Sequence, residues 1–304
     1  MVTQLDEKIT GAESVNWDLS DLYAAIDDPK IEQDILRTDE RADKFAEVYR
    51  GKVATFDAEE MYEAVVEYEG IVEAASRLEA YAHLIWTTDS ANAKYGALLQ
   101  KLTEWSSRLQ QTLVFFELEW VNAPDEFANQ MISHPVLSHY HHWLEATRRY
   151  QPHRLSEPEE KILAEKAVTG RDAWTRFFSE FLGNTRYPFE GEELTQSAIL
   201  SKLYVPDRDV RKRAAAAFTD VMQKQLPVLT FVFNTLAAEK ASDDRLRHYP
   251  SWVSSRNLAN EVSDEVVDAL INAVTSRYDI VERYYKLKRE LLGVDKLYDY
   301  DRYA

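Results

Sequence analysis

The clearest hydrophobic pattern in the chain lies in residues 57–86. Apolar residues recur there at every third or fourth position, which is the spacing of one face of an amphipathic helix. Asp57 and Glu60 have the spacing of a capping box at the start of this helix. We expect the apolar face to be buried against neighbouring helices. Its members are Met61, Val65, Tyr68, Val72, Ala75, Leu78, Ala82 and Ile85.

A second long helix is predicted after the polar residues 87–92, and it should end near Asn122, before Pro124. Two long helices joined by a short turn form an antiparallel αα-hairpin. A further helix should precede this hairpin. It would begin at Asp28-Pro29, because aspartate caps helices and proline suits the first turn, and it would end at Gly51.

Shorter helices are expected after Pro124 and after Pro135. Ser156 and Glu159 form a capping box, and the helix that they open should end at Gly183. Residues 184–194 interrupt the helical pattern and indicate a loop or a small β-hairpin, because Tyr187 and Phe189 flank a proline and precede Glu190-Gly191-Glu192.

Helix resumes near Thr195, and a long helix begins at Pro206-Asp207. That helix should kink or break at Pro227, because proline lacks the N–H that a helix interior needs. Ser263 caps the last helix, which should end at Gly293. Its expected buried face is Val267, Leu270, Val274, Tyr278, Val281 and Tyr285, and the aromatic pairs expected in the core are Phe115-Phe116, Phe177-Phe178 and Tyr284-Tyr285.

The scarcity of turn residues, with 8 glycines and 9 prolines in 304 residues, agrees with long helices rather than with a β-sandwich. We therefore predict an all-α fold. It should be a multi-helix array with long antiparallel helical hairpins and at most one small β-hairpin or loop near 184–194.

The net charge of −17 argues against nucleic-acid binding, which requires basic clusters. The sequence contains no cysteine, so disulfides, thiolate nucleophiles and cysteine-bound zinc are all excluded. No apolar run approaches the ~18 residues of a membrane span, and residues 1–17 contain no apolar region of a signal peptide. We therefore predict a cytoplasmic protein that binds neither nucleic acid nor membrane.

A catalytic zinc site on a helix needs two histidines at i and i+4 and an intervening glutamate, in the pattern HExxH. The chain has seven histidines, and none is followed by glutamate, so this motif is missing. They are His83, His134, His139, His141, His142, His153 and His248.

A possible substitute is the cluster of His134, His139, His141 and His142 with Glu145. On a helix, His139 and His142 would share one face, and His141 would pair with Glu145 on another. However, Arg148 and Arg149 follow one turn later and would repel a divalent ion. Ordinary hydrogen-bonded histidines of a packed helix are therefore favoured over a metal site. Phosphate-binding loops, serine nucleophile elbows and EF-hands are also missing from the sequence.

Several segments, in order along the chain, closely resemble the oligoendopeptidase F group of M3-family zinc metallopeptidases. The most specific is YQPHRLSEPEEKILAEKAVTGRDAW, from Tyr150 to Trp174. The others are WDLSDLY (17–23), VPDRDVRKRAAAAF (205–218), DDRLR (243–247) and the segment 277–304 that contains RYYKLKRELLG.

This resemblance implies helical layers around a deep channel, in which zinc activates water against a peptide bond. It also implies that HExxH follows downstream of this segment, so the chain would be the non-catalytic N-terminal half, inactive alone. No zinc ligand or general base of the family maps onto this sequence. We therefore assign no catalytic, cofactor-binding or metal-binding residue, and zinc would belong to the full-length parent.

The implied partners are short peptide substrates and the missing C-terminal catalytic half. The implied division is a helical hairpin lobe at 1–112, helices like the family's N-terminal domain at 113–183, and the start of the peptidase domain at 184–304. The alternative is a stand-alone helical module that binds peptides or a partner helix without catalysis. Pro227 and residues 184–194 are the expected hinges of the channel, because both interrupt helices.

Overall fold

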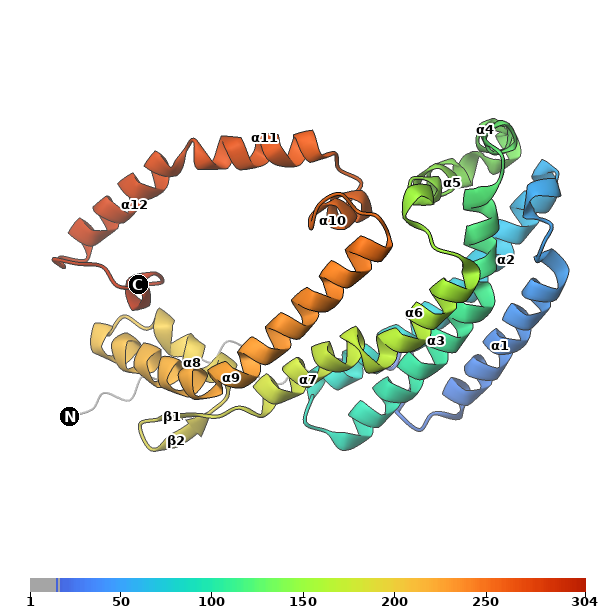
Figure 1. Cartoon of the computed structure of the whole chain (residues 1–304). Coiled ribbons are helices and arrows are strands. Elements are labelled where there is room, and N and C mark those ends of the chain that lie inside the picture. The colour runs from blue at the N-terminus through green and yellow to red at the C-terminus, as the bar shows by residue number, and fades with distance from the viewer. Residues whose placement is uncertain (1–14, 16) are drawn as a thin grey trace.

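The computed structural model describes residue 15 and residues 17–304. The all-α prediction is confirmed, since helices dominate the described residues and their sheet has two short strands. The predicted hairpin is formed by α2 (Ala58–Thr88) and α3 (Ala93–Asn122), and α1 (Pro29–Tyr49) packs beside it (Figure 1). The N-terminal segment for which we predict no signal peptide lies mostly outside the described residues.

The predicted helix starts are confirmed by the side chains that cap them. Asp28 accepts a hydrogen bond from the N–H of Lys30, and Asp57 and Glu60 form the expected capping box. Gly51, which follows the end of α1, has a φ of 78°, a left-handed conformation that favours glycine.

Three shorter helical segments follow the hairpin and complete the main core. They are α4 (Asp125–Ser133), the 3₁₀ helix Pro135–Tyr140 and α5 (His141–Arg148). The core contains most of the predicted stripe of α2, although Val72 is 39% exposed. Phe115 and Phe116 are fully buried, as expected, and the indole N–H of Trp120 donates to the carbonyl oxygen of Leu144.

The prediction of one helix from Ser156 to Gly183 is wrong. The structure has two helices, α6 (Glu157–Thr169) and α7 (Arg171–Asn184), separated at Gly170. A Cβ atom at this position would lie 2.9 Å from the carbonyl oxygen of Lys166. The chain therefore turns at a residue where only glycine fits without displacing backbone.

Of the two predicted possibilities for residues 184–194, a loop or a small β-hairpin, the structure has the hairpin. It consists of β1 (Tyr187–Phe189) and β2 (Glu192–Leu194), paired antiparallel with Tyr187 opposite Leu194. Its turn residues Glu190 and Gly191 both have positive φ. Tyr187 is buried and stacks on Phe218, so the hairpin forms a second, smaller core with α8 (Gln196–Ser201) and α9 (Arg208–Leu246).

Helix α9 contains Pro227 in its interior, and Figure 1 shows its axis changing direction between its two halves. The predicted kink is therefore present. After α10 (Ser254–Ala259), the chain forms α11 (Asp264–Thr275), α12 (Tyr278–Leu291) and a final 3₁₀ turn, Asp299–Asp301. We call α1–α7 the lobe, which is a larger unit than the hairpin lobe predicted at 1–112. We call the segment from α9 to the final turn the frame, and the part of the frame formed by α11 and α12 the arm.

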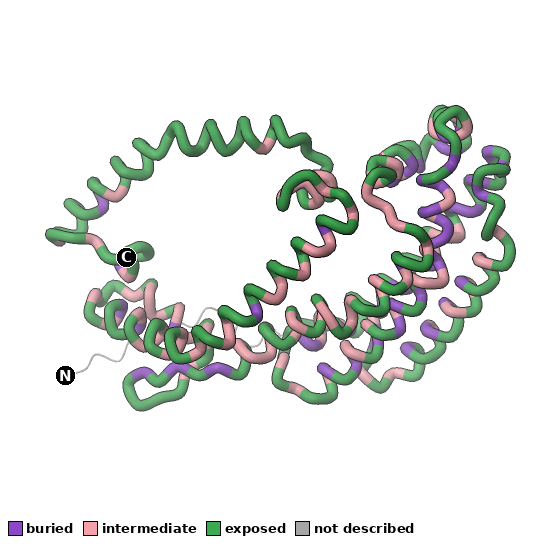
Figure 2. The backbone as a smooth tube through the Cα atoms, in the orientation of Figure 1, coloured by how far each residue is buried: buried purple, intermediate pink, exposed green. Residues whose placement is uncertain are grey.

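The prediction of a single buried last helix is wrong in two respects. The helix is divided into α11 and α12 near Ser276 and Arg277, and its apolar face is not covered by the described part of the chain. Figure 2 shows the arm almost entirely exposed, whereas buried positions concentrate in the lobe. Of the predicted face, Leu270, Val274, Tyr278 and Val281 are each more than half exposed, while Val267 and Tyr285 are half-buried.

Two of the three aromatic pairs also lie outside the core. Phe177 and Phe178 are 42% and 41% exposed, and Tyr284 is 55% exposed. The alternation of apolar and polar residues correctly indicated amphipathic helices here, but the surface that would cover them is not among the described residues.

Candidate functional site: an arginine–aspartate clamp

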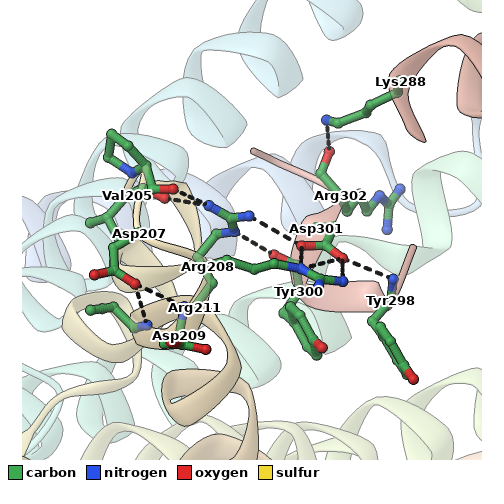
Figure 3. Close-up of polar contacts among 12 residues, drawn as sticks. Val205, Asp207, Arg208, Asp209, Arg211, Lys288, Tyr298, Tyr300, Asp301 and Arg302 are labelled. Carbon is green, nitrogen blue, oxygen red and sulfur yellow. Dashed lines mark hydrogen bonds and ion pairs between the residues drawn. The ribbon is translucent and has the colours of Figure 1, made fainter. Parts of the chain in front are cut away.

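The most enclosed ionic cluster of the described chain closes the frame on itself. Asp301, in the final turn, accepts hydrogen bonds from two arginines in the first turns of α9 (Figure 3). Its Oδ2 lies 2.8 Å from Nη2 of Arg208, and its Oδ1 lies 3.1 Å from Nη2 of Arg211. The Asp301 side chain has no exposed surface, and that of Arg211 is 3% exposed. We call Arg208, Arg211 and Asp301 the clamp.

The local sequence explains this geometry. Asp207 caps α9 by accepting from the N–H groups of Asp209 and Val210, which fixes the direction of the first turn. Arg208 and Arg211 are three residues apart and therefore lie on the same face of the helix. The guanidinium of Arg211 also donates to three backbone carbonyl oxygens, those of Val205, Pro206 and Tyr300.

The clamp carboxylate remains ionised. Hydrogen bonds from Arg208, the main cause, and from the N–H of Tyr298 and from Arg211 hold the pKa of Asp301 well below its usual range despite burial. The guanidinium of Arg208 also lies against two aromatic rings. Its carbon is 5.8 Å from the ring centre of Tyr298 and 5.6 Å from that of Tyr300.

These contacts hold backbone segments together and are not arranged for proton transfer. Both oxygens of Asp301 are engaged, Oδ1 by Arg208 and Arg211, and Oδ2 by Arg208 and the N–H of Tyr298. Lys288 of α12 adds a hydrogen bond to the carbonyl oxygen of Arg302. The clamp therefore fixes the far end of the arm to the start of α9.

A second ionic cluster joins the frame to the lobe, and we call it the joint. Arg247, at the end of α9, donates to both oxygens of Glu160 on α6, at 2.7 and 2.9 Å, and to Asp243 at 2.9 Å. Glu160 is 7% exposed. Burial would raise the pKa of Glu160, but hydrogen bonds from Arg247 and from the N–H of Leu155 outweigh it and lower this pKa.

The joint is extended by an aromatic stack. His153 stacks on Tyr249 with ring centres 3.9 Å apart, and its Nδ1 donates to the carbonyl oxygen of Arg247 at 2.8 Å. Next to the joint lies a cleft of about 390 Å³, which is lined by residues of α3, α6, α7 and α9. Its charged lining residues are Glu160, Lys166, Arg171, Glu239, Asp243 and Arg247.

The structure separates the histidines that the sequence placed near one another. His142 lies 3.0 Å from Glu261, two residues after the end of α10, instead of facing a metal with His139. Arg149 is within 4 Å of both Glu145 and Glu261, and His139 packs edge-on against Tyr140. Within residues 15 and 17–304, no group of three or more His, Asp or Glu side chains could hold a metal ion. In the same residues, no helix is long and apolar enough to cross a membrane.

Neither the clamp nor the joint was predicted from the sequence. Both fall in segments that carry the family resemblance, VPDRDVRKRAAAAF and DDRLR, but their partners lie about 90 residues away in the chain. The available signal was local. It is the pair of arginines three positions apart directly after a helix cap.

Comparisons with known proteins agree with this architecture. The family described as Oligopeptidase F matches residues 119–187, and Peptidase family M3 matches residues 201–304. The chain belongs to peptidase family M3.

Curated proteins similar to this chain are bacterial oligopeptidases. Group B oligopeptidase PepB of Streptococcus agalactiae is 28% identical over 304 residues, which cover 96% of this chain and 49% of PepB. Oligopeptidase PepF of Bacillus subtilis is 28% identical over 269 residues, which cover 84% of this chain and 39% of PepF. The chain therefore spans about half the length of these relatives or less.

Solved structures show the same fold. The crystal structure of oligoendopeptidase-F from Enterococcus faecium matches with a TM-score of 0.80 at 24% identity, and the match covers 90% of this chain and 55% of that one. A putative oligoendopeptidase F from Bacillus anthracis matches with a TM-score of 0.67 at 16% identity, over 90% of this chain and 47% of that one.

Proposed function

We propose that this chain is the N-terminal, non-catalytic part of a zinc-dependent oligoendopeptidase that hydrolyses short unfolded peptides. Membership of family M3 and the oligopeptidase relatives support the peptidase class. The lack of HExxH anywhere in the sequence supports placing the catalytic centre in the remainder of the parent polypeptide. The chain by itself is then inactive, and its proposed location is the cytoplasm.

The observation that carries this proposal is the exposed apolar surface of the arm. Large apolar side chains follow one another along α11 and α12, and a folded protein covers such contiguous surface with another part of the molecule or a partner. Those exposed by more than half are Val266, Leu270, Ile271, Val274, Tyr278, Val281, Tyr284, Leu287 and Leu291. We propose that the catalytic half covers them in the parent.

The cleft between α6–α7 and α9 supports the further proposal that this chain forms one wall of the substrate channel. Lys166 and Arg171 line it together with Glu239 and Asp243, so the wall offers both signs of charge to the termini of a peptide. The division at residues 112 and 183, and the hinges at Pro227 and 184–194, remain predictions of this proposal.

Zinc belongs to the parent in this proposal. When bound there, it would activate water for attack on the peptide bond. The described residues of this chain do not fit a zinc site, because no three of their His, Asp or Glu side chains come together in a group that could hold a metal ion. We therefore propose that this chain shapes the substrate channel and limits the access of peptides to it.

The test compares purified 1–304 with the full parent polypeptide, using internally quenched peptides of increasing length and elemental analysis for zinc. We expect hydrolysis and one zinc per molecule in the parent, and neither in 1–304. Hydrolysis and stoichiometric zinc in 1–304 would overturn the proposal. A coding region that stops after Ala304 would favour the alternative, a module that binds oligopeptides in the cleft without cutting them, and calorimetric titration with a pentapeptide would detect it.

A further inference from the structure

The arm has almost no core of its own. Among the described side chains of α11 and α12, only Lys288 is buried. Isolated helices of this length are marginal in water, so tertiary contacts must keep them ordered. The arm has such contacts at its two ends.

At the near end, the side-chain amide of Asn257 on α10 donates to Asp264 at 2.7 Å. At the far end, Lys288 donates to the carbonyl oxygen of Arg302, and the clamp fixes the following turn to α9. The clamp therefore closes a loop that starts at Arg208 and returns at Asp301. In Figure 1 the C-terminus lies beside α8 and α9, so the frame is a closed ring of helices.

We infer that the clamp pre-forms the apolar face of the arm as a docking surface for the catalytic half of the peptidase, an inference that rests on the proposed function. The occupant is identified by two observations. The arm lies inside the segment that matches peptidase family M3, residues 201–304, and the relatives that share it are about twice as long. Its exposed face is apolar, so the surface that covers it is apolar as well.

Pre-forming matters because a surface that is ordered before association loses less conformational entropy on binding. If the clamp opens, the arm is tethered at its near end alone, and its helices must order again when the partner binds. The association should then weaken by roughly tenfold or more, since several side chains and two helices lose their fixed positions.

The chain offers a matched pair of substitutions for the test. Arg211→Gln removes a buried charge of the clamp, whereas Arg213→Gln removes an exposed charge two residues later that pairs with Glu190. Asp301→Asn removes the other side of the clamp with little change in volume. None of these residues is placed in a catalytic site.

The first measurement is hydrogen exchange of 1–304. We expect Arg211→Gln and Asp301→Asn to raise exchange rates in α11 and α12 by at least about tenfold, while α1–α3 remain protected and Arg213→Gln matches the wild type. An equal loss of protection in α1–α3 would overturn the inference, because the clamp would then be a general stabiliser of the fold.

The second measurement is co-expression of tagged 1–304 with the remainder of the parent as a separate chain. We expect wild type and Arg213→Gln to retain the remainder and Arg211→Gln to retain roughly tenfold less. Equal retention of the remainder by all variants would overturn the docking inference. Failure of the wild type to retain the remainder, while the joined parent hydrolyses peptides, would also overturn the docking inference and leave the proposed function intact. A joined parent without activity would instead refute the proposed function.

Discussion

Removing the carboxylate of Glu160 should lower the free energy of unfolding more than removing any exposed charge of α6. In Glu160→Ala, the guanidinium of Arg247 loses both of its hydrogen bonds to Glu160 and remains largely buried, with its side chain 19% exposed. Breaking a buried ion pair by removing one partner costs about 3–5 kcal/mol. Arg247 retains Asp243 and some contact with water, so we expect a smaller loss of about 2–3 kcal/mol in the free energy of unfolding.

The measurement is urea unfolding of 1–304, followed by circular dichroism and by tryptophan fluorescence. Glu165→Ala is the matched control, because Glu165 lies on the same helix and is exposed, and its loss should change stability by less than about 0.5 kcal/mol. A double-mutant cycle with Arg247→Ala isolates the coupling between the two side chains. If Glu160→Ala and Glu165→Ala differ by less than 0.5 kcal/mol (about the error of such cycles), the joint does not hold the frame to the lobe.

Three further predictions follow from the described contacts. The pKa of Asp301 is lowered in the folded state, so the clamp contributes fully to the free energy of unfolding above the ordinary carboxyl pKa. This contribution is lost as the pH falls towards the lowered pKa. In urea titrations, the stability difference between wild type and Asp301→Asn should therefore be constant from pH 7 to about pH 4 and shrink below pH 4. Trp120→Phe should cost about 0.5–1.5 kcal/mol in the free energy of unfolding, because the carbonyl oxygen of Leu144 loses the indole N–H of Trp120 as a donor; differential scanning calorimetry would show this as a lower Tm, and an unchanged Tm would contradict it. Pro227→Ala in the full parent should alter peptide turnover if the bend of α9 is a hinge, and unchanged kcat and KM would remove that role.

Helix starts were predictable from the sequence because the responsible atoms are close together in the chain. Asp28, Asp57, Asp207 and Ser263 each cap the helix that directly follows them. The hairpin at 187–194 was also predictable, since Glu190-Gly191 between apolar residues is a local turn signal. The family resemblance was equally local, and the comparisons confirmed it.

Features that depend on distant residues were not predictable from one sequence. The break at Gly170 depends on the approach of its backbone to the carbonyl oxygen of Lys166, and glycine inside a helical pattern does not by itself reveal this. The clamp joins Arg211 to Asp301 across nearly a third of the chain, which no local pattern shows. The apolar face of the arm was predicted as buried, because an amphipathic period indicates that one face of a helix is covered. The period does not indicate whether the covering surface belongs to the same segment of polypeptide.

The proline in the middle of α9 has a consequence for the backbone around it. Pro227 has no N–H, so the carbonyl oxygen of Gln223, four residues earlier, cannot receive its usual helical hydrogen bond. In a regular helix interior, each carbonyl oxygen accepts a hydrogen bond from a backbone N–H. At this bend, the Gln223 carbonyl is open to a donor other than the N–H of residue 227, such as a water molecule or a polar side chain.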